Sequence, residues 1–412
     1  MWTGCAAEDG AADGALGDSG AGSASGDDSD GSGDYPGEET GEGGDPTGGG
    51  SDGEGDTAGG AGDDGGEDPG GEGEQIEPGQ LTAGEWRDLD HWAFWLDLMQ
   101  VEEWSGYADR WRFHTTQRFA VAVESDGVSL ADVPVALVSA DGTLWEARTD
   151  VRGRAELFAG VFGDEVQGPL SIHVDGEEVA TEVEPAGEDP LVLDVPESSA
   201  PQDVLDLMFM IDTTGSMGDE LSYLQVELAD VIDEVQTMAG DVQVRLSVNF
   251  YRDHGDAYVV REFPFTTDID QALADLAAQG SDGGGNYPEA VIEALDSAVD
   301  SHEWSPSARA RLMFLVLDAP PHHDGQGELL MNTRVQEAAA AGIRIIPVAS
   351  SGVDKDTEFF LRFIDILTGG TYVFLTNHSG IGGDHIEPTI GEYEVELLND
   401  LLVRVIGASL GS

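Results

Sequence analysis

Two carboxylates and two hydroxyls form the part of the sequence best suited to chemistry. Asp212 directly follows an apolar run, and Thr214 and Ser216 come shortly after it. Asp318 directly follows a second apolar run, much further along the chain. A carboxylate at the end of a buried strand costs free energy unless it is paired or bound to a metal. Because these oxygen ligands are hard, the four residues predict a site for Mg²⁺, with Mn²⁺ or Ca²⁺ as alternatives.

A plainer interpretation is that Asp212 caps a helix and Asp318 caps a turn, since Asp is a good capping residue. Either residue alone would fit that role. Their placement at the ends of two apolar runs, beside two hydroxyls, favours the metal site.

The elements that position these residues follow from the pattern around them. Apolar runs occupy 205–211, 242–250, 312–317 and 343–348, with helical patterns between them. This alternation is typical of an α/β fold with a doubly wound, mostly parallel sheet. Ligands of such sheets lie beyond the carboxyl ends of the strands, at the point where the strand order reverses.

The spacing Asp212-x-Thr214-x-Ser216 resembles the metal-ion-dependent adhesion site of von Willebrand factor type A domains. Asp318 matches the third motif of that family, an Asp at the end of the fourth strand. The resemblance covers residues 203–409 and implies a Rossmann-like fold with a bound divalent cation. Independently of the resemblance, the change from period-two runs to the βα pattern at the linker 198–202 predicts that residues 203–409 fold as a unit separate from the preceding domain.

One element departs from the family pattern. The second motif of the family is a threonine in the loop between the third and fourth strands, and here that loop reads GSDGGGNYPEA. Asn286 lies where the threonine is expected. Since an amide carbonyl can ligate a hard cation directly or through water, Asn286 is the fifth candidate ligand.

The resemblance implies a function in protein binding, of the adhesion or scaffold type, and no catalysis. An Asp or Glu side chain of a protein partner would complete the coordination of the metal. A subunit of an ATP-driven chelatase or chaperone-type complex is the alternative, because similar domains dock onto motor proteins. The subcellular location would separate these two functions.

A metal-dependent hydrolase is a further alternative. Two loops are rich in His and Asp: Asp253, His254 and Asp256 in one, and His322, His323 and Asp324 in the other. No common hydrolase motif accompanies them. Convergence of His254 and His322 within metal-bonding reach would favour catalysis.

Two regions precede the α/β pattern. Residues 119–197 alternate apolar and polar positions in six short runs, which predicts a β-sandwich that resembles carboxypeptidase-regulatory-like and bacterial Ig-like modules. Residues 76–118 are expected to pack on that sandwich. Thr82 and Glu85 have capping-box spacing, which predicts helical turns. The tryptophans of this segment are expected to wedge the domains together, with a carbohydrate-stacking platform as the alternative: Trp86, Trp92, Trp95, Trp104 and Trp111.

Residues 1–75 are rich in Gly and acidic side chains, and no Lys or Arg occurs before Arg87. Such a composition predicts a disordered linker, with weak calcium binding as an alternative. The whole chain has 83 acidic and 17 basic residues and a net charge of −66, which disfavours binding to nucleic acid.

Cys5 is the single cysteine, so an intramolecular disulfide framework is excluded. The sequence WTGC resembles the end of a bacterial lipoprotein signal peptide, in which the cysteine is acylated, although the signal peptide itself is not visible. We therefore expect either that Cys5 is a lipidation site and the chain begins further upstream, or that Cys5 is incidental. Lipidation would place the protein at the cell envelope or outside the cell, with membrane contact only through the anchor.

Overall fold

The computed structural model describes residues 76–163, 166–187, 189–196, 200–285 and 287–411. The expected linker 1–75, including Cys5, and the candidate ligand Asn286 lie outside the described residues. None of the helices in these ranges combines the length and the apolar composition that a membrane span requires.

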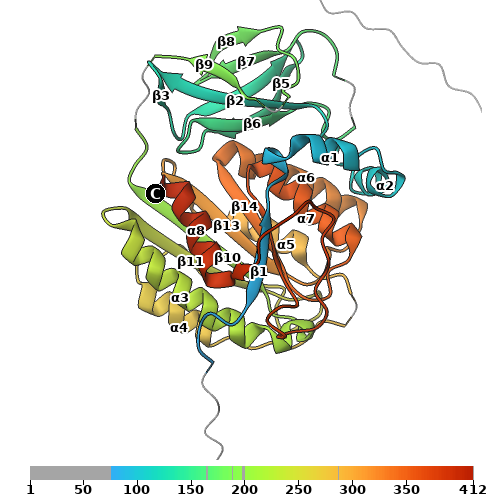
Figure 1. Cartoon of the computed structure of the whole chain (residues 1–412), viewed down its shortest axis with the longest axis vertical. Helices are drawn as coiled ribbons and strands as arrows, with labels where there is room; N and C mark the ends of the chain where they lie inside the picture. Colours follow the sequence, from blue (N-terminus) through green and yellow to red (C-terminus); the bar gives the residue numbers. More distant parts are fainter. Residues whose placement is uncertain (1–75, 164–165, 188, 197–199, 286, 412) are drawn as a thin grey trace, which may run out of the picture. The chain divides into compact units, whose positions relative to one another are not determined.

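An eight-stranded sheet forms the centre of the α/β domain (Figure 1), in the order β12-β11-β10-β13-β14-β15-β1-β16. The strands β11, β10, β13, β14 and β15 are parallel, and β12, β1 and β16 are antiparallel to their neighbours. The first six follow the order of a doubly wound fold, so the predicted fold class is confirmed. These six are β10 (Val204–Asp212), β11 (Gln243–Tyr251), β12 (Val260–Arg261), β13 (Ala310–Leu317), β14 (Ile343–Ala349) and β15 (Tyr372–Leu375).

Helices cover both faces of this sheet, so its central strands are apolar on both sides. Every residue of β10 and of β13 is buried. One face packs against α3 (Leu221–Ala239), α4 (Ile269–Ala277) and α8 (Leu398–Leu410). The other packs against α5 (Val291–Asp296), α6 (Gly325–Ala341) and α7 (Lys355–Thr368). Two short helices, η2 (Gly215–Asp219) and the π-helix η3 (Ser297–Ser301), complete the domain.

A strand from outside the predicted domain completes the sheet. β1 (Thr82–Trp86) lies between β15 and the short β16 (Glu396–Leu397), antiparallel to both. The prediction of helical turns at Thr82 and Glu85 is therefore wrong. Pairing with strands on both sides favours a strand here, and Gly84 lets β1 lie against Phe374, whose ring a Cβ at this position would overlap.

The start of β1 is fixed by one buried carboxylate. Glu227 of α3 accepts hydrogen bonds from the backbone N–H groups of Gly79, Gln80 and Leu81, at 2.8, 2.6 and 3.0 Å. Three consecutive amides thus stabilise a charge that has almost no contact with water. This glutamate clamp holds the chain at the point where it enters the sheet.

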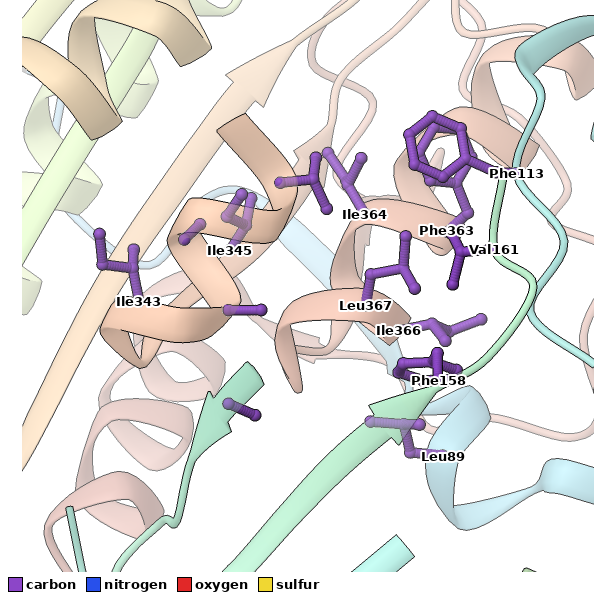
Figure 2. Packing of buried hydrophobic residues seen from close by; sticks show 14 of the residues in the cluster. Leu89, Phe113, Phe158, Val161, Ile343, Ile345, Phe363, Ile364, Ile366 and Leu367 are labelled. Atoms are coloured by element: carbon purple, nitrogen blue, oxygen red, sulfur yellow. The ribbon is translucent and has the colours of Figure 1, made fainter. Parts of the chain in front are cut away.

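The tryptophan-rich segment continues with η1 (Asp88–Asp90), α1 (Trp92–Leu98) and α2 (Glu102–Trp111). All five of its tryptophans are buried, so the carbohydrate-stacking alternative is wrong. Trp95 stacks on Phe359 of α7, and Trp92 contacts Phe158 of the sandwich. Figure 2 shows Phe113 over Phe363, with ring centroids 3.7 Å apart. The segment therefore packs on the α/β domain as well as on the sandwich.

The sandwich consists of two four-stranded sheets. In one, β2 pairs with β3, β6 and β9; the other has the order β5-β4-β7-β8. The strands are β2 (Arg118–Ser125), β3 (Val128–Ser129), β4 (Pro134–Ser139), β5 (Gly142–Arg148), β6 (Arg154–Phe158), β7 (Ser171–Val174), β8 (Glu177–Thr181) and β9 (Leu191–Asp194).

Two buried ion pairs join these regions to the α/β domain. Arg362 of α7 donates to both carboxylate oxygens of Asp88, at 2.8 and 2.7 Å, and also to Glu358. Asp132 of the sandwich accepts from Arg311 of β13 at 2.9 Å and from Arg148 at 2.7 Å. Asp88 and Asp132 thus each pair with an arginine of the α/β domain.

Candidate metal centre

The two predicted carboxylates lie at the ends of neighbouring parallel strands. β10 and β13 pair in a register that places Ile211 opposite Val316, so Asp212 and Asp318 emerge at the same edge of the sheet. Both carboxylates are buried. Between these strands the order of the doubly wound sheet reverses, which is where such folds bind their ligands.

Hydrogen bonds orient the first carboxylate and the two hydroxyls. One oxygen of Asp212, Oδ1, accepts from the backbone N–H of Thr214 at 2.8 Å and from its hydroxyl at 2.7 Å. The hydroxyls of Thr214 and Ser216 are hydrogen-bonded at 3.1 Å. The structure therefore brings together four of the five predicted metal ligands, and Asn286 stays a prediction.

The remaining oxygens of the two carboxylates have no partner. Asp212 Oδ2 and Asp318 Oδ1 are buried and form no hydrogen bond of normal geometry with the described residues, although the buried Tyr251 hydroxyl lies close enough to Asp212 to lower its pKa. An unpaired buried carboxylate oxygen is costly, whereas coordination to a cation would stabilise it. Two such oxygens beside two hydroxyls fit a hard divalent cation.

The electrostatics of the centre agree with this chemistry. Burial, and then the charge of Asp318, raise the pKa of Asp212 to about 7. Burial also raises the pKa of Asp318 to about 6. Without a cation, the two groups therefore ionise at a higher pH than an ordinary Asp does. A divalent cation would reverse this effect, because it favours the charged form of both.

Glu289 is a third acidic group of the centre, and the sequence analysis missed it. It is buried, its Oε2 has no partner among the described residues, and its pKa is raised to about 8 by burial and then by Asp212. A backbone hydrogen bond of 2.9 Å from Glu289 N to Pro320 O holds it beside the end of β13. The one available signal was an acidic residue in the loop that also contains Asn286.

A glycine loop places Glu289 next to the hydroxyls. A Cβ built on Gly284 would lie 3.0 Å from Glu289 Oε1 and 3.3 Å from Thr214 Cβ. Asp256 holds this loop, because its Oδ2 accepts from Gly284 N at 2.9 Å and from Asp253 N at 3.1 Å. Gly283 has a φ of +82°, and any Cβ there would overlap the carboxylate of Asp256, so the loop requires glycine.

A cleft of about 600 Å³ lies over the centre. Ser216, Glu289 and Asp318 line its floor, and Tyr287 and Asp384 also line it. The Tyr287 hydroxyl donates to Gly352 O at 3.0 Å, which fixes the glycine loop to the loop after β14. The cleft therefore reaches Ser216 and Asp318 of the centre, whereas Asp212 lies buried beneath them and does not line it.

The histidine loops converge only in part. Nitrogen atoms of His254 and His322 and a carboxylate oxygen of Asp253 all lie within 4.8 Å of one another. This is the arrangement that the sequence analysis named as favouring catalysis. The other three residues of those loops have separate contacts: Asp256 supports the glycine loop, Asp324 caps α6, and His323 contacts Glu328 at 3.1 Å.

Comparison with family models identifies the α/β domain by its sequence. The sequence profile of the von Willebrand factor type A domain matches residues 206–374. Over 190 residues the chain is 25% identical to an ariadne-like RING finger protein of Acanthamoeba polyphaga mimivirus; the match covers 42% of this chain and 18% of that protein. The crystal structure of the conserved hypothetical protein BatB from Bacteroides thetaiotaomicron is 15% identical, with a TM-score of 0.27, and the match covers 50% of this chain and 87% of that one.

The chain thus spans less than a fifth of the length of its mimivirus relative. The profile match begins inside β10 and ends inside β15, so it includes both carboxylates of the centre. The chain contains a von Willebrand factor type A domain.

Proposed function

We propose that the domain binds a protein partner through a divalent cation, most suitably Mg²⁺, held by Asp212, Thr214, Ser216 and Asp318. The observation that carries this proposal is the pair of buried carboxylate oxygens without partners. When bound, the cation supplies positive charge and a coordination position that an Asp or Glu side chain of the partner can fill.

The residues of the chain have different roles in this mechanism. Asp212 and Asp318 provide the charge that retains the cation. The hydrogen bonds from Thr214 to Asp212 Oδ1 leave Oδ2 directed away from them and available to the cation. Glu289, with its raised pKa, can remain protonated beside the centre, which limits the repulsion of an acidic partner.

The direct test separates cation binding from partner binding. Calorimetric titration of the full chain with Mg²⁺ should show a site that is lost in Asp212→Ala. Pull-downs from envelope extracts should then recover a partner with wild type in Mg²⁺, and fail with EDTA or with Asp212→Ala. Asp270→Ala is the matched control, since it removes an exposed carboxylate of α4. A partner that binds equally in EDTA and to Asp212→Ala would reject the mechanism.

A location at the cell envelope, with Cys5 acylated, belongs to the same proposal and rests on the sequence WTGC. Fractionation of cells that express the full-length gene, with mass spectrometry of the N-terminal peptide, tests it. A diacylated or triacylated Cys5 in the membrane fraction supports a surface adhesion or scaffold role. A soluble cytoplasmic protein with free Cys5 would favour the alternative, a subunit of a chelatase or chaperone-type complex.

A further inference from the structure

Beside the metal centre, three side chains from two loops form a separate cluster. Asp253 and His254 follow β11, and His322 follows β13. His322 Nε2 lies 2.5 Å from Asp253 Oδ1. The imidazole rings of His254 and His322 are stacked, with centroids 5.0 Å apart and an angle of 19° between their planes.

The size of the cluster matches a metal site. One ligand atom from each of the three residues lies within 4.8 Å of the other two. Ligand atoms around a tetrahedral Zn²⁺ lie about 3.3 Å apart, given metal–ligand bonds of about 2.0–2.1 Å. His254 is about half exposed and His322 about a quarter exposed, which leaves both imidazoles room to rotate toward that spacing.

The surroundings also suit a metal ligand set. Asp253 is buried, and its backbone N–H is held by Asp256, so one ligand is fixed. His254 contacts Glu293 of α5, with Nε2 and Oε1 2.7 Å apart. A carboxylate on a ligating histidine orients the ring and raises its basicity. The cluster thus has a carboxylate on its buried side and an oriented imidazole on its exposed side.

The type of ligand separates this cluster from the oxygen centre. Two imidazoles and one carboxylate suit Zn²⁺, Co²⁺ or Ni²⁺, whereas Mg²⁺ and Ca²⁺ prefer oxygen alone. Three protein ligands leave a fourth position of a tetrahedral ion open, as in zinc sites that accept water or an external ligand. The exposed side of the cluster, at His254, is where such a ligand would enter.

We propose that Asp253, His254 and His322 form a second metal site, which takes a transition ion of the Zn²⁺ class and leaves one coordination position open. This site is independent of the proposed Mg²⁺ centre, although the two are close: Asp253 is among the charges that act on Glu289. The domain would therefore carry two neighbouring cations of different chemical class.

Titration of the full chain with Zn²⁺ or Co²⁺, in excess Mg²⁺, tests the proposal. We expect one tight equivalent, and at least about tenfold weaker binding in His254→Ala and in His322→Ala, which corresponds to about 1.4 kcal/mol each. His323→Ala is the matched control, because this adjacent histidine contacts Glu328 instead. Unchanged Zn²⁺ affinity in both ligand variants would overturn the proposal.

Asp212→Ala separates the two sites. It should lose Mg²⁺ and keep the tight equivalent of Zn²⁺, so failure of one proposal leaves the other testable. Loss of Zn²⁺ in Asp212→Ala, with Zn²⁺ retained in the histidine variants, would place the ion in the oxygen centre and overturn the second site.

Co²⁺ spectra distinguish the loss of a metal ligand from a folding defect in the variants. The visible bands of bound Co²⁺ report nitrogen ligands and coordination number, so they should change in His254→Ala even if some binding persists. The midpoint of thermal unfolding should rise with Zn²⁺ in wild type and in His323→Ala, but not in the double variant His254→Ala/His322→Ala. Identical Co²⁺ spectra in wild type and in the double variant would reject the ligand assignment.

Discussion

Two pairs of buried carboxylates in this protein differ in where the compensating charge originates. Asp88 and Asp132 meet arginines of the same chain, whereas Asp212 and Asp318 each keep one oxygen without a partner. Burial alone would raise the pKa of Asp132, but hydrogen bonds from Arg311 and Arg148 hold it below its usual value. The pKa of Asp212 is instead raised to about 7.

This difference distinguishes carboxylates that join parts of the fold from carboxylates that are proposed to bind a cation. Where the chain supplies its own cation, the carboxylate joins two parts of the fold. Where the chain supplies none, the carboxylate pair is unfavourable alone and would be favourable with a bound ion, as the proposed metal-dependent site requires.

The largest loss of stability should come from removing Asp88 and Asp132 together. A fragment of residues 203–412 lacks Asp88, Asp132 and strand β1, so Arg362 and Arg311 lose their partners and β15 loses its neighbour. We expect no cooperative unfolding transition, although the sequence pattern alone predicted a separate unit. Urea unfolding followed by circular dichroism decides between these outcomes, with residues 76–412 as the control.

The next largest effect should come from Arg362→Met. Asp88 would remain buried without its cation, which costs about 3–5 kcal/mol, and Glu358 would keep only Lys355. Urea unfolding of the full chain measures it. Arg404→Met is the control, because its pairs with Glu85 and Glu396 are partly exposed and should contribute only about 0–1 kcal/mol. Equal losses of stability in both variants would show that the buried and the partly exposed ion pairs do not differ in this way.

Asp212→Asn, in contrast, should increase the stability of the protein in EDTA. The folded protein retains a proton on Asp212 up to about pH 7, whereas the unfolded chain releases it near the ordinary value of 3.8. Wild type therefore loses stability between these pH values, and the variant should gain roughly 2–4 kcal/mol by pH 7.

That gain should grow from about pH 4 to pH 7 and then level off, as measured by thermal unfolding across the pH range. In excess Mg²⁺ the order should reverse, because the cation stabilises only wild type. A variant less stable than wild type in EDTA would show that the carboxylate is already compensated.

The smallest effect should come from Thr214→Ala. Water can replace a neutral hydroxyl, so Mg²⁺ binding should weaken by about 1 kcal/mol, much less than in Asp212→Ala. Thr214→Ser keeps the hydroxyl and serves as the control in calorimetric titrations. A loss in Thr214→Ala as large as that in Asp212→Ala would mean that the hydroxyl orients the whole carboxylate pair.

Local signals made the oxygen centre predictable. The Asp-x-Thr-x-Ser spacing and the two apolar runs are short-range features, and neighbouring parallel strands bring their ends together. Glu289 escaped prediction, because its role depends on a loop whose path is set by Asp256 and by contact with Pro320. The sequence pattern also does not reveal that Arg362 pairs with Asp88, 274 positions away, or that β1 pairs with β15.

The position of β1 has a mechanical consequence. The register of Ala83 with Leu375 places the start of β1 at the carboxyl end of β15, on the edge of the sheet that holds the metal centre. Suppose that a partner bound at that centre is pulled away from an attachment of the chain before residue 76. The glutamate clamp of Glu227 and the hydrogen bonds of β1 would then carry the force. The sandwich, which follows β1 in the chain, carries none of this load while β1 stays paired. Release of β1 would lengthen the connection and then pass the force to the Asp88–Arg362 pair and the tryptophan-rich helices on α7, so β1 and its clamp would be the first elements to resist such a pull.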